Sequence, residues 1–172
     1  MSHDIADISL QAGDEEVTLR LVTQGNWQEA LRLAVHPNQQ LFVSEYAPIV
    51  AIALAKAYLH LGGATWLPYA INVGATMVGF VALAYEPDTP GEYWIFHFFI
   101  DQRYQGRGYG KLALRHTIEL VKAEHPQCYL VTLVVHPENH QAQRLYTAAG
   151  FRMTGAERWG EPVYQLALRD IP

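Results

Sequence analysis

The chain has few of the residues that several kinds of protein require. Its 172 residues include one cysteine, Cys128, so an internal disulfide and a cysteine-based zinc site are both excluded. Half of the residues are hydrophobic, but no uninterrupted apolar run is long enough to span a bilayer. The first residues, Met1 to Asp4, lack a basic segment followed by an apolar one, so nothing there indicates export. We therefore expect no membrane partner and a cytoplasmic location.

Positive charge is also scarce. Lysine and arginine together number 12 against 17 acidic residues, which gives a formal net charge of −5. This balance provides no basic surface for nucleic acid and slightly favours small cationic ligands. The length suits one domain over residues 1–172, with 1–15 as a flexible or peripheral segment. No internal repeat or linker interrupts it.

Hydrophobic periodicity and turn residues predict a mixed α/β fold. Helices are expected at 48–61, 108–124 and 139–149, with a further helix that begins after Asn26 as N-cap. The predicted strands are 17–22, 66–73, 76–85, 93–100, 128–135, 151–157 and 163–168.

A glycine-rich turn follows the strand at 93–100 and leads directly into a helix. It reads Gln105-Gly106-Arg107-Gly108-Tyr109-Gly110-Lys111. The first N–H groups of a helix lack intrahelical partners and carry the positive end of its dipole, so they can hold a diphosphate. Glycines remove the Cβ atoms that would keep phosphates away. The turn is therefore a candidate phosphate-binding loop.

Two other kinds of phosphate-binding loop fit this turn less well. A Walker loop needs Ser or Thr after its lysine, and here Leu112 follows Lys111. A dinucleotide fingerprint fits Gly108, Gly110 and Ala113, but it should open the first βαβ unit, and this turn lies past mid-chain.

The pattern Gln-x-x-Gly-x-Gly, with Gln105, Gly108 and Gly110, resembles the coenzyme A loop of the GCN5-related N-acetyltransferase (GNAT) family. A second segment, 139–151, resembles the family's Asn-x-x-Ala-x-x-Leu-Tyr-x-x-x-Gly-Phe signature. Its matching residues are Asn139, Ala142, Leu145, Tyr146, Gly150 and Phe151.

This resemblance implies the GNAT fold. That fold is a single mixed, mostly antiparallel sheet of about seven strands, with helices on both faces and a splay between the fourth and fifth strands. It also implies transfer of an acetyl group from acetyl-CoA to a primary amine by direct attack in a ternary complex. The implied cofactor contacts are the strand backbone of Phe98, Phe99 and Ile100, the loop residues Gln105, Gly106, Arg107, Gly108, Tyr109, Gly110 and Lys111, and the side chains of Arg103, Asn139 and Arg144.

Tyr146 occupies the family position at which a phenol gives its proton to the departing thiolate. A phenol stays protonated at neutral pH and can hydrogen-bond a developing sulfur anion. The sequence leaves open which group removes the proton from the amine, because the strand at 93–100 lacks the glutamate that some relatives carry there. His97, Glu92 and water alone are the three alternatives, and each histidine or carboxylate also has a purely structural interpretation.

The acceptor is expected near the loop at 36–46. Phe42, Glu45 and Tyr46 there suit an alkylammonium group, and His136 is placed by Pro137 to face the same pocket. Gln-x-x-Phe-Val at 39–43 and the glycine turn together resemble bacterial spermine or spermidine acetyltransferases. A polyamine or similar small amine is the expected acceptor, while an amino acid, an antibiotic amine or a protein N-terminus remain open. A non-catalytic acyl-CoA sensor and a homodimer are further open alternatives.

Overall fold

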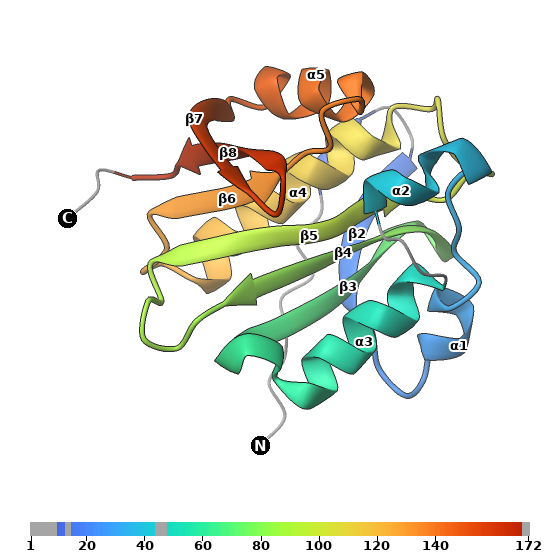
Figure 1. The fold of residues 1–172 in the computed structure, drawn as a ribbon. Coiled ribbons are helices and arrows are strands. Elements are labelled where there is room, and N and C mark those ends of the chain that lie inside the picture. Colours follow the sequence, from blue (N-terminus) through green and yellow to red (C-terminus); the bar gives the residue numbers. More distant parts are fainter. Residues whose placement is uncertain (1–9, 13–14, 44–47, 170–172) are drawn as a thin grey trace.

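The computed structural model describes residues 10–12, 15–43 and 48–169 (Figure 1). All strands belong to one eight-stranded sheet with the order β1-β2-β3-β4-β5-β6-β8-β7. The strands are β1 (Leu10–Ala12), β2 (Glu15–Leu21), β3 (Thr65–Val73), β4 (Thr76–Tyr85), β5 (Glu92–Ile100), β6 (Leu130–Val134), β7 (Arg152–Arg158) and β8 (Glu161–Ala167).

The predicted mixed, mostly antiparallel sheet is confirmed, since β5 and β6 form the one parallel pair among the described strands. The seven predicted strands correspond to β2 through β8. The additional strand, β1, is a three-residue edge strand that pairs with β2 inside the segment we expected to be flexible or peripheral. The rest of that segment, 1–9 and 13–14, lies outside the described residues.

Helices cover both faces of the sheet. They are α1 (Trp27–Ala30), α2 (Gln40–Val43), α3 (Ile49–Leu59), α4 (Tyr109–Glu124) and α5 (His140–Ala148), with the short 3-10 turns η1 (Pro37–Gln39) and η2 (Leu61–Gly63). Figure 1 shows α3 and α4 on opposite faces. Among the described residues, no helix has an apolar stretch long enough to cross a membrane.

Two separate cores result from this arrangement. The α4-side core contains Leu114 and Val121 of α4 together with Tyr93 and Ile95 of β5. The α3-side core contains Val50 of α3, among other apolar side chains. Each core removes a continuous set of apolar side chains from water, which is the main stabilising contribution to such a fold.

The structure adds detail at two predicted helix ends. Asn26 is the N-cap residue of α1 as predicted, but its side chain makes no capping hydrogen bond: its Oδ1 accepts from the Thr23 N–H at 2.7 Å instead. The helix predicted to stop at Gly62-Gly63 ends earlier, at His60, which has a left-handed backbone with φ 47°. A left-handed residue ends a helix as glycine does, but only the structure reveals it at a histidine.

Strand β5 contains a bulge. Phe96 lies opposite Ala82 and Phe99 lies opposite Phe80, so two residues of β5 face one residue of β4 between them. One of the two, His97, has φ 51°, in the left-handed region. The bulge reverses which face the side chains take: Ile95 belongs to the α4-side core, whereas Phe99 belongs to the α3-side core.

Candidate active site

The glycine turn lies between β5 and the start of α4, as predicted, and we call residues 105–111 the cradle. Gly106 and Gly108 have φ values of 78° and 84°, which residues with a Cβ rarely adopt. Gly108 is the N-cap of α4, a helix of 16 residues. In the described structure, no protein acceptor contacts the backbone N–H of Gly106, Gly108 or Gly110. Glycine conformation and available N–H groups together fit the diphosphate of a nucleotide cofactor.

Gln105 holds this cradle in place through its side chain. Its Nε2 donates to the Gln39 Oε1 at 2.8 Å and to the Ile100 carbonyl at 3.0 Å. The Gln39 Nε2 donates in return to the Gln105 Oε1 at 3.2 Å. The Gln105 amide is thus engaged with the protein itself, and its side chain positions the loop.

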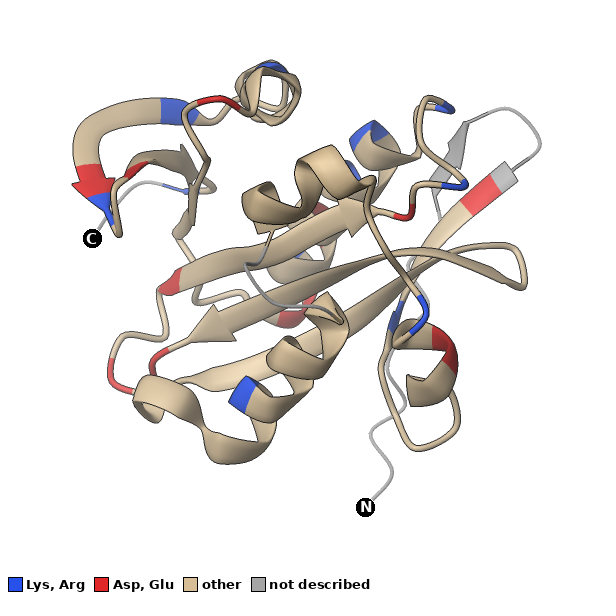
Figure 2. Ribbon diagram, turned by 45° about the vertical axis from the view of Figure 1, so that its right-hand side comes forward, with Lys and Arg blue, Asp and Glu red and all other residues tan. Residues whose placement is uncertain are grey.

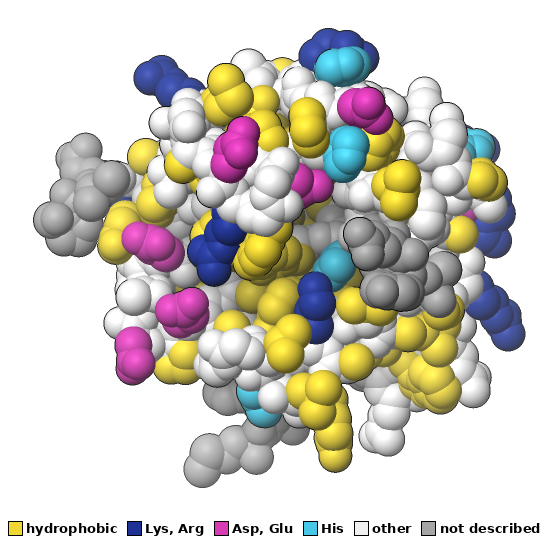
Figure 3. Space-filling view, viewed as in Figure 1, with side chains coloured by type: hydrophobic (Ala, Val, Ile, Leu, Met, Phe, Trp, Pro, Cys, Tyr) yellow, Lys and Arg dark blue, Asp and Glu magenta, His cyan; other side chains and the backbone are white. Residues whose placement is uncertain are grey.

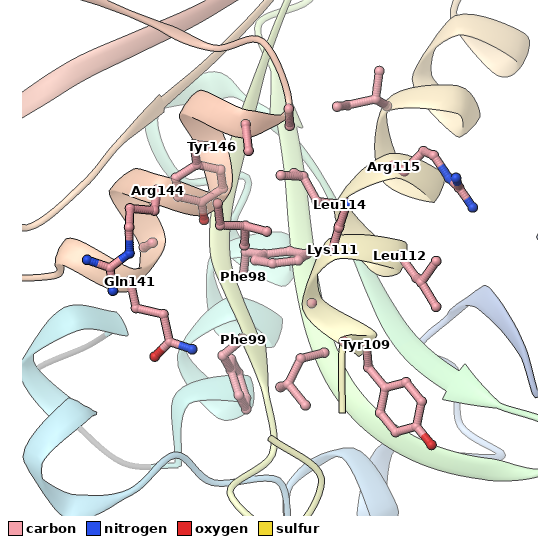
Figure 4. Close-up of a pocket in the computed structure, with 18 of the residues that line it drawn as sticks. Phe98, Phe99, Tyr109, Lys111, Leu112, Leu114, Arg115, Gln141, Arg144 and Tyr146 are labelled. Carbon is pink, nitrogen blue, oxygen red and sulfur yellow. The ribbon is translucent and has the colours of Figure 1, made fainter. Parts of the chain in front are cut away.

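A cavity of about 840 Å³ opens beside the cradle (Figure 4). Lys111 projects from α4 on one side of it, and Gln141 and Arg144 project from α5 on the other. The predicted cofactor residues that line this cavity are Phe98, Phe99, Ile100, Gln105, Gly106, Gly108, Tyr109, Gly110, Lys111, Asn139 and Arg144. We call it the donor cavity.

Two predicted cofactor residues lie outside the lining of the donor cavity. Arg103 pairs with Asp101 at 2.7 Å, and Arg107 donates to the Arg103 carbonyl at 3.4 Å. Burial acts to raise the pKa of Asp101, but hydrogen bonds from Arg103 and Ala34 hold it below its ordinary value. Arg103 therefore forms a structural ion pair with the buried carboxylate of Asp101.

The predicted splay separates β5 from β6. The two strands pair only from Glu92 to Trp94 on β5 and from Leu130 to Thr132 on β6. Beyond Trp94 the facing backbone groups of β5 have no partner from β6, and the donor cavity reaches the strand there, at Phe98. Unpaired strand groups need hydrogen-bond partners, and an extended ligand can supply them.

Tyr146 lies where the donor cavity meets a second cavity. It projects from α5, whose N-cap Asn139 accepts from the Ala142 N–H at 3.1 Å as predicted. The Tyr146 and Phe98 rings, both labelled in Figure 4, have centroids 6.3 Å apart. The Tyr146 side chain is buried, and burial raises its pKa. Its hydroxyl therefore remains protonated at neutral pH.

The second cavity, of about 910 Å³, lies on the face shown in Figure 3. The figure shows a hollow with a hydrophobic floor and charged and histidine side chains around it. We call this the acceptor cavity. It shares six lining residues with the donor cavity: Phe42, Val43, Phe98, Asn139, Ala142 and Tyr146.

His97 lines the acceptor cavity, but its ring nitrogens are occupied. A carbonyl only accepts, so Nδ1 carries the proton and donates to the Val43 carbonyl at 2.8 Å. Nε2 then accepts from the Lys56 Nζ at 3.0 Å. Burial and the nearby Lys56 charge lower the pKa of His97 to about 4. The imidazole is therefore neutral, and its one accepting nitrogen is already engaged.

Of the other residues predicted to bind the acceptor or act as the base, some line the acceptor cavity and one lies outside both cavities. Phe42 and His136 line the acceptor cavity, with ring centroids 5.1 Å apart. Glu45 and Tyr46 lie outside the described residues. Glu92, at the opposite end of β5, lines neither cavity and accepts from the Tyr129 hydroxyl at 3.5 Å.

Several acceptor-cavity residues were missing from the sequence prediction. Lys56 is the one charged residue of α3 and appears as the blue band on that helix in Figure 2. Its ammonium lies over the Trp66 and Phe96 rings, 5.0 and 5.8 Å from their centroids. The other missed residues are Trp94, Arg158, Trp159, Glu86 and Glu161. A lone lysine on an apolar helix was the available signal for Lys56.

Comparison with known proteins agrees with this geometry. The family model described as "Acetyltransferase (GNAT) family" matches residues 27–151. A spermine/spermidine N(1)-acetyltransferase of Bacillus subtilis (strain 168) is 33% identical over 144 residues, covering 81% of this chain and 90% of the relative. The N-alpha-acetyltransferase RimI of Mycobacterium tuberculosis (strain ATCC 25618 / H37Rv) is 30% identical over 153 residues, covering 87% of each.

Solved structures share the fold at lower identity. Aminoglycoside acetyltransferase AAC(6')-Ib with acetyl-CoA has a TM-score of 0.71 and 20% identity, covering 88% of this chain and 93% of that one. Spermidine N-acetyltransferase from Vibrio cholerae, in complex with CoA and spermine, has a TM-score of 0.66 and 16% identity, covering 87% and 92%. The chain therefore belongs to the acetyltransferase (GNAT) family of acyl-CoA-dependent enzymes.

Proposed function

We propose that the protein transfers the acetyl group of acetyl-CoA to a primary amine of a small cationic acceptor such as a polyamine. One observation carries this proposal: a cavity that begins at the phosphate cradle and an aromatic cavity meet at Phe98 and Tyr146. Such a junction suits a reaction between two ligands that enter from different cavities. Holding both reactants in one geometry lowers the entropic part of the barrier.

The donor cavity would hold the cofactor through three kinds of contact. The N–H groups of Gly106, Gly108 and Gly110 would bind the diphosphate, aided by the positive end of the α4 dipole. Lys111 and Arg144, both exposed at the cavity, would add charge-assisted hydrogen bonds. The backbone N–H and C=O groups of β5 that β6 leaves unpaired would form hydrogen bonds with the extended part of coenzyme A.

When bound, acetyl-CoA supplies the thioester whose carbonyl carbon is open to attack by an amine. Tyr146 would then serve as the proton donor at the sulfur. Its phenol is protonated, and it lies at the junction of the two cavities. General-acid catalysis of this type contributes about 10²- to 10⁴-fold in rate.

Removal of the amine proton would not need a carboxylate of β5. His97 has a pKa of about 4 and an occupied Nε2, which argues against it as base. Glu92 lines neither cavity. We propose that water in the acceptor cavity takes the proton, with His136 lining that cavity. The rate would then follow the small neutral fraction of the amine.

The acceptor cavity supports a cationic substrate. Its walls include five Phe or Trp side chains from β3, β5 and the β7–β8 turn, and two carboxylates, those of Glu86 and Glu161. Aromatic faces attract ammonium groups, and carboxylates add charge complementarity. The relation to a Bacillus subtilis spermine/spermidine acetyltransferase supports the same acceptor class.

The test is release of free CoA from acetyl-CoA in the presence of single amines. The panel contains spermine, spermidine, an aminoglycoside, a free amino acid and a peptide with an unblocked N-terminus. We expect release above the hydrolysis background with the polyamines, confirmed by the mass of the acetylated product. Tight acetyl-CoA binding with no release for any amine would replace this proposal with a non-catalytic sensor.

A further inference from the structure

The turn between β7 and β8 carries an aromatic residue in an unfavourable backbone conformation. Arg158 pairs with Glu161, so Trp159 and Gly160 form a two-residue hairpin turn. Both have positive φ, 54° and 78°. Such turns favour Asn or Asp followed by Gly, because these residues tolerate positive φ. Gly160 matches this preference, and Trp159 does not.

Packing gives little reason for a tryptophan at this position. The Trp159 side chain is 65% exposed, so its burial stabilises the fold only slightly. Its ring instead extends the aromatic wall of the acceptor cavity, with centroids 6.1 Å from Trp94 and 6.0 Å from Phe96. A strained residue that contributes little to the core and lines a ligand cavity points to a role in binding.

A cation already lies on this wall. The Arg158 guanidinium carbon is 4.6 Å from the Trp94 ring centroid and 4.5 Å from that of Trp159. In the described structure, Arg158, Glu86 and Glu161 form no ion pair, and the basic group that acts on Glu161 is His136 of the same cavity, which favours the charged carboxylate. The faces of the two rings thus contact the Arg158 guanidinium, which is exposed and has no ion-pair partner to hold it there.

We propose that Trp159 is a specificity-determining residue, which with Trp94 and Phe96 binds a second cationic group of the acceptor amine. In this arrangement the acceptor's ammonium displaces the Arg158 guanidinium from the two rings, while the reacting amine lies near Tyr146. Glu86 and Glu161 supply the opposite charge. This inference rests on the proposed acetyl transfer to small amines.

The test compares hexamethylenediamine with hexylamine, which has the same chain and no second amine. We expect Trp159→Leu and Trp159→Asn to raise the KM for the diamine about tenfold, from loss of the cation–π contact. The KM for hexylamine and for acetyl-CoA should change less than about twofold, since neither uses that contact. Arg158→Gln should lower the KM for the diamine, because it removes the competing cation.

Stability separates the binding role from a structural one. Trp159→Asn relieves the positive φ and should raise the Tm by about 2–4 °C, whereas Trp159→Leu should not. The control is His60→Asn, which relieves a similar left-handed residue outside both cavities and should leave every KM unchanged.

Wild-type enzyme that acetylates neither amine would contradict the proposed function. A wild-type enzyme that acetylates both, together with Trp159 variants whose diamine KM is unchanged, would overturn only the role of Trp159. An equal rise in KM for both amines would also overturn the role of Trp159, because Trp159 would then contact the alkyl chain that both amines share and not the second ammonium group.

Discussion

The side-chain amides of Gln39 and Gln105 form a reciprocal pair of hydrogen bonds that joins η1 to the cradle. Each amide uses its oxygen as acceptor and its nitrogen as donor toward the other. The pair fixes the loop that lines the donor cavity, although Gln39 lies more than sixty residues away in sequence. The cradle is therefore built from two distant parts of the chain.

Loss of this pair should weaken cofactor binding. Gln39→Ala removes both hydrogen bonds to Gln105, of about 1 kcal/mol each, together with the one that Gln39 accepts from the His36 N–H. We expect the Kd for CoA to rise about fivefold to tenfold. Isothermal titration calorimetry measures it directly. Gln102→Ala, an exposed glutamine of the same loop region, is the matched control. An unchanged Kd for Gln39→Ala would show that the cradle holds its shape without the pair.

Two glycines of the cradle should respond in opposite ways to a methyl group. Gly108→Ala forces a Cβ onto a backbone with φ 84° and should lower stability by about 1 kcal/mol. Gly110 lies inside α4, where an added Cβ meets only ordinary contacts at 3.7 Å, so Gly110→Ala should raise the Tm. Both variants should bind CoA more weakly, because both modify the cradle surface. Thermal unfolding and CoA titration of the two proteins give the comparison, and a fall in Tm for Gly110→Ala would contradict it.

Removing the phenol of the proposed proton donor should slow the reaction without loosening the cofactor. Tyr146→Phe is expected to lower kcat about 100-fold or more, since it deletes one general-acid contribution. The Kd for acetyl-CoA should stay nearly the same. Tyr129→Phe, which removes a hydroxyl outside both cavities, serves as control. Full turnover in Tyr146→Phe would exclude this residue as the acid.

The partly buried imidazole of His97 should make the fold sensitive to acid. Its folded pKa of about 4 lies below the ordinary value of 6.5, so the unfolded chain binds a proton first as the pH falls. Stability contributed by the neutral ring is complete above about pH 6.5 and is lost as the pH falls toward about 4. A shift of this size corresponds to roughly 3 kcal/mol.

Denaturant unfolding at a series of pH values measures this loss. His97→Asn cannot titrate and tolerates a left-handed backbone, so its stability should vary less over the same interval. Parallel curves for the two proteins would show that His97 does not carry the acid sensitivity. The variant should also keep substantial activity, because His97 is not expected to act as the base.

Local sequence signals predicted the parts of the site that depend on local geometry. The cradle at 105–111 follows from glycine spacing and the start of a helix, and Asn139 caps α5 as its position suggests. Both features are set within a few residues of chain. Tyr146 could be identified for the same reason, from its place in a continuous motif.

The features that escaped prediction depend on contacts between distant segments. Lys56 reaches His97 across 41 residues, and Gln39 reaches Gln105 across 66. In both pairs, the residues next to each partner in the sequence give no signal that predicts the contact. The short helix α2 was also missed, because four residues carry too little periodicity to separate from a loop.

The bulge in β5 divides one strand into two stretches whose side chains alternate in opposite phase. Before it, Trp94 and Phe96 line the acceptor cavity, while after it the Phe98 ring lies 6.3 Å from the Tyr146 ring, where the two cavities meet. Under the proposed function, a substitution at Trp94 or Phe96 would therefore alter the acceptor cavity and leave unchanged the stretch from Phe98 to Ile100 that lines the donor cavity.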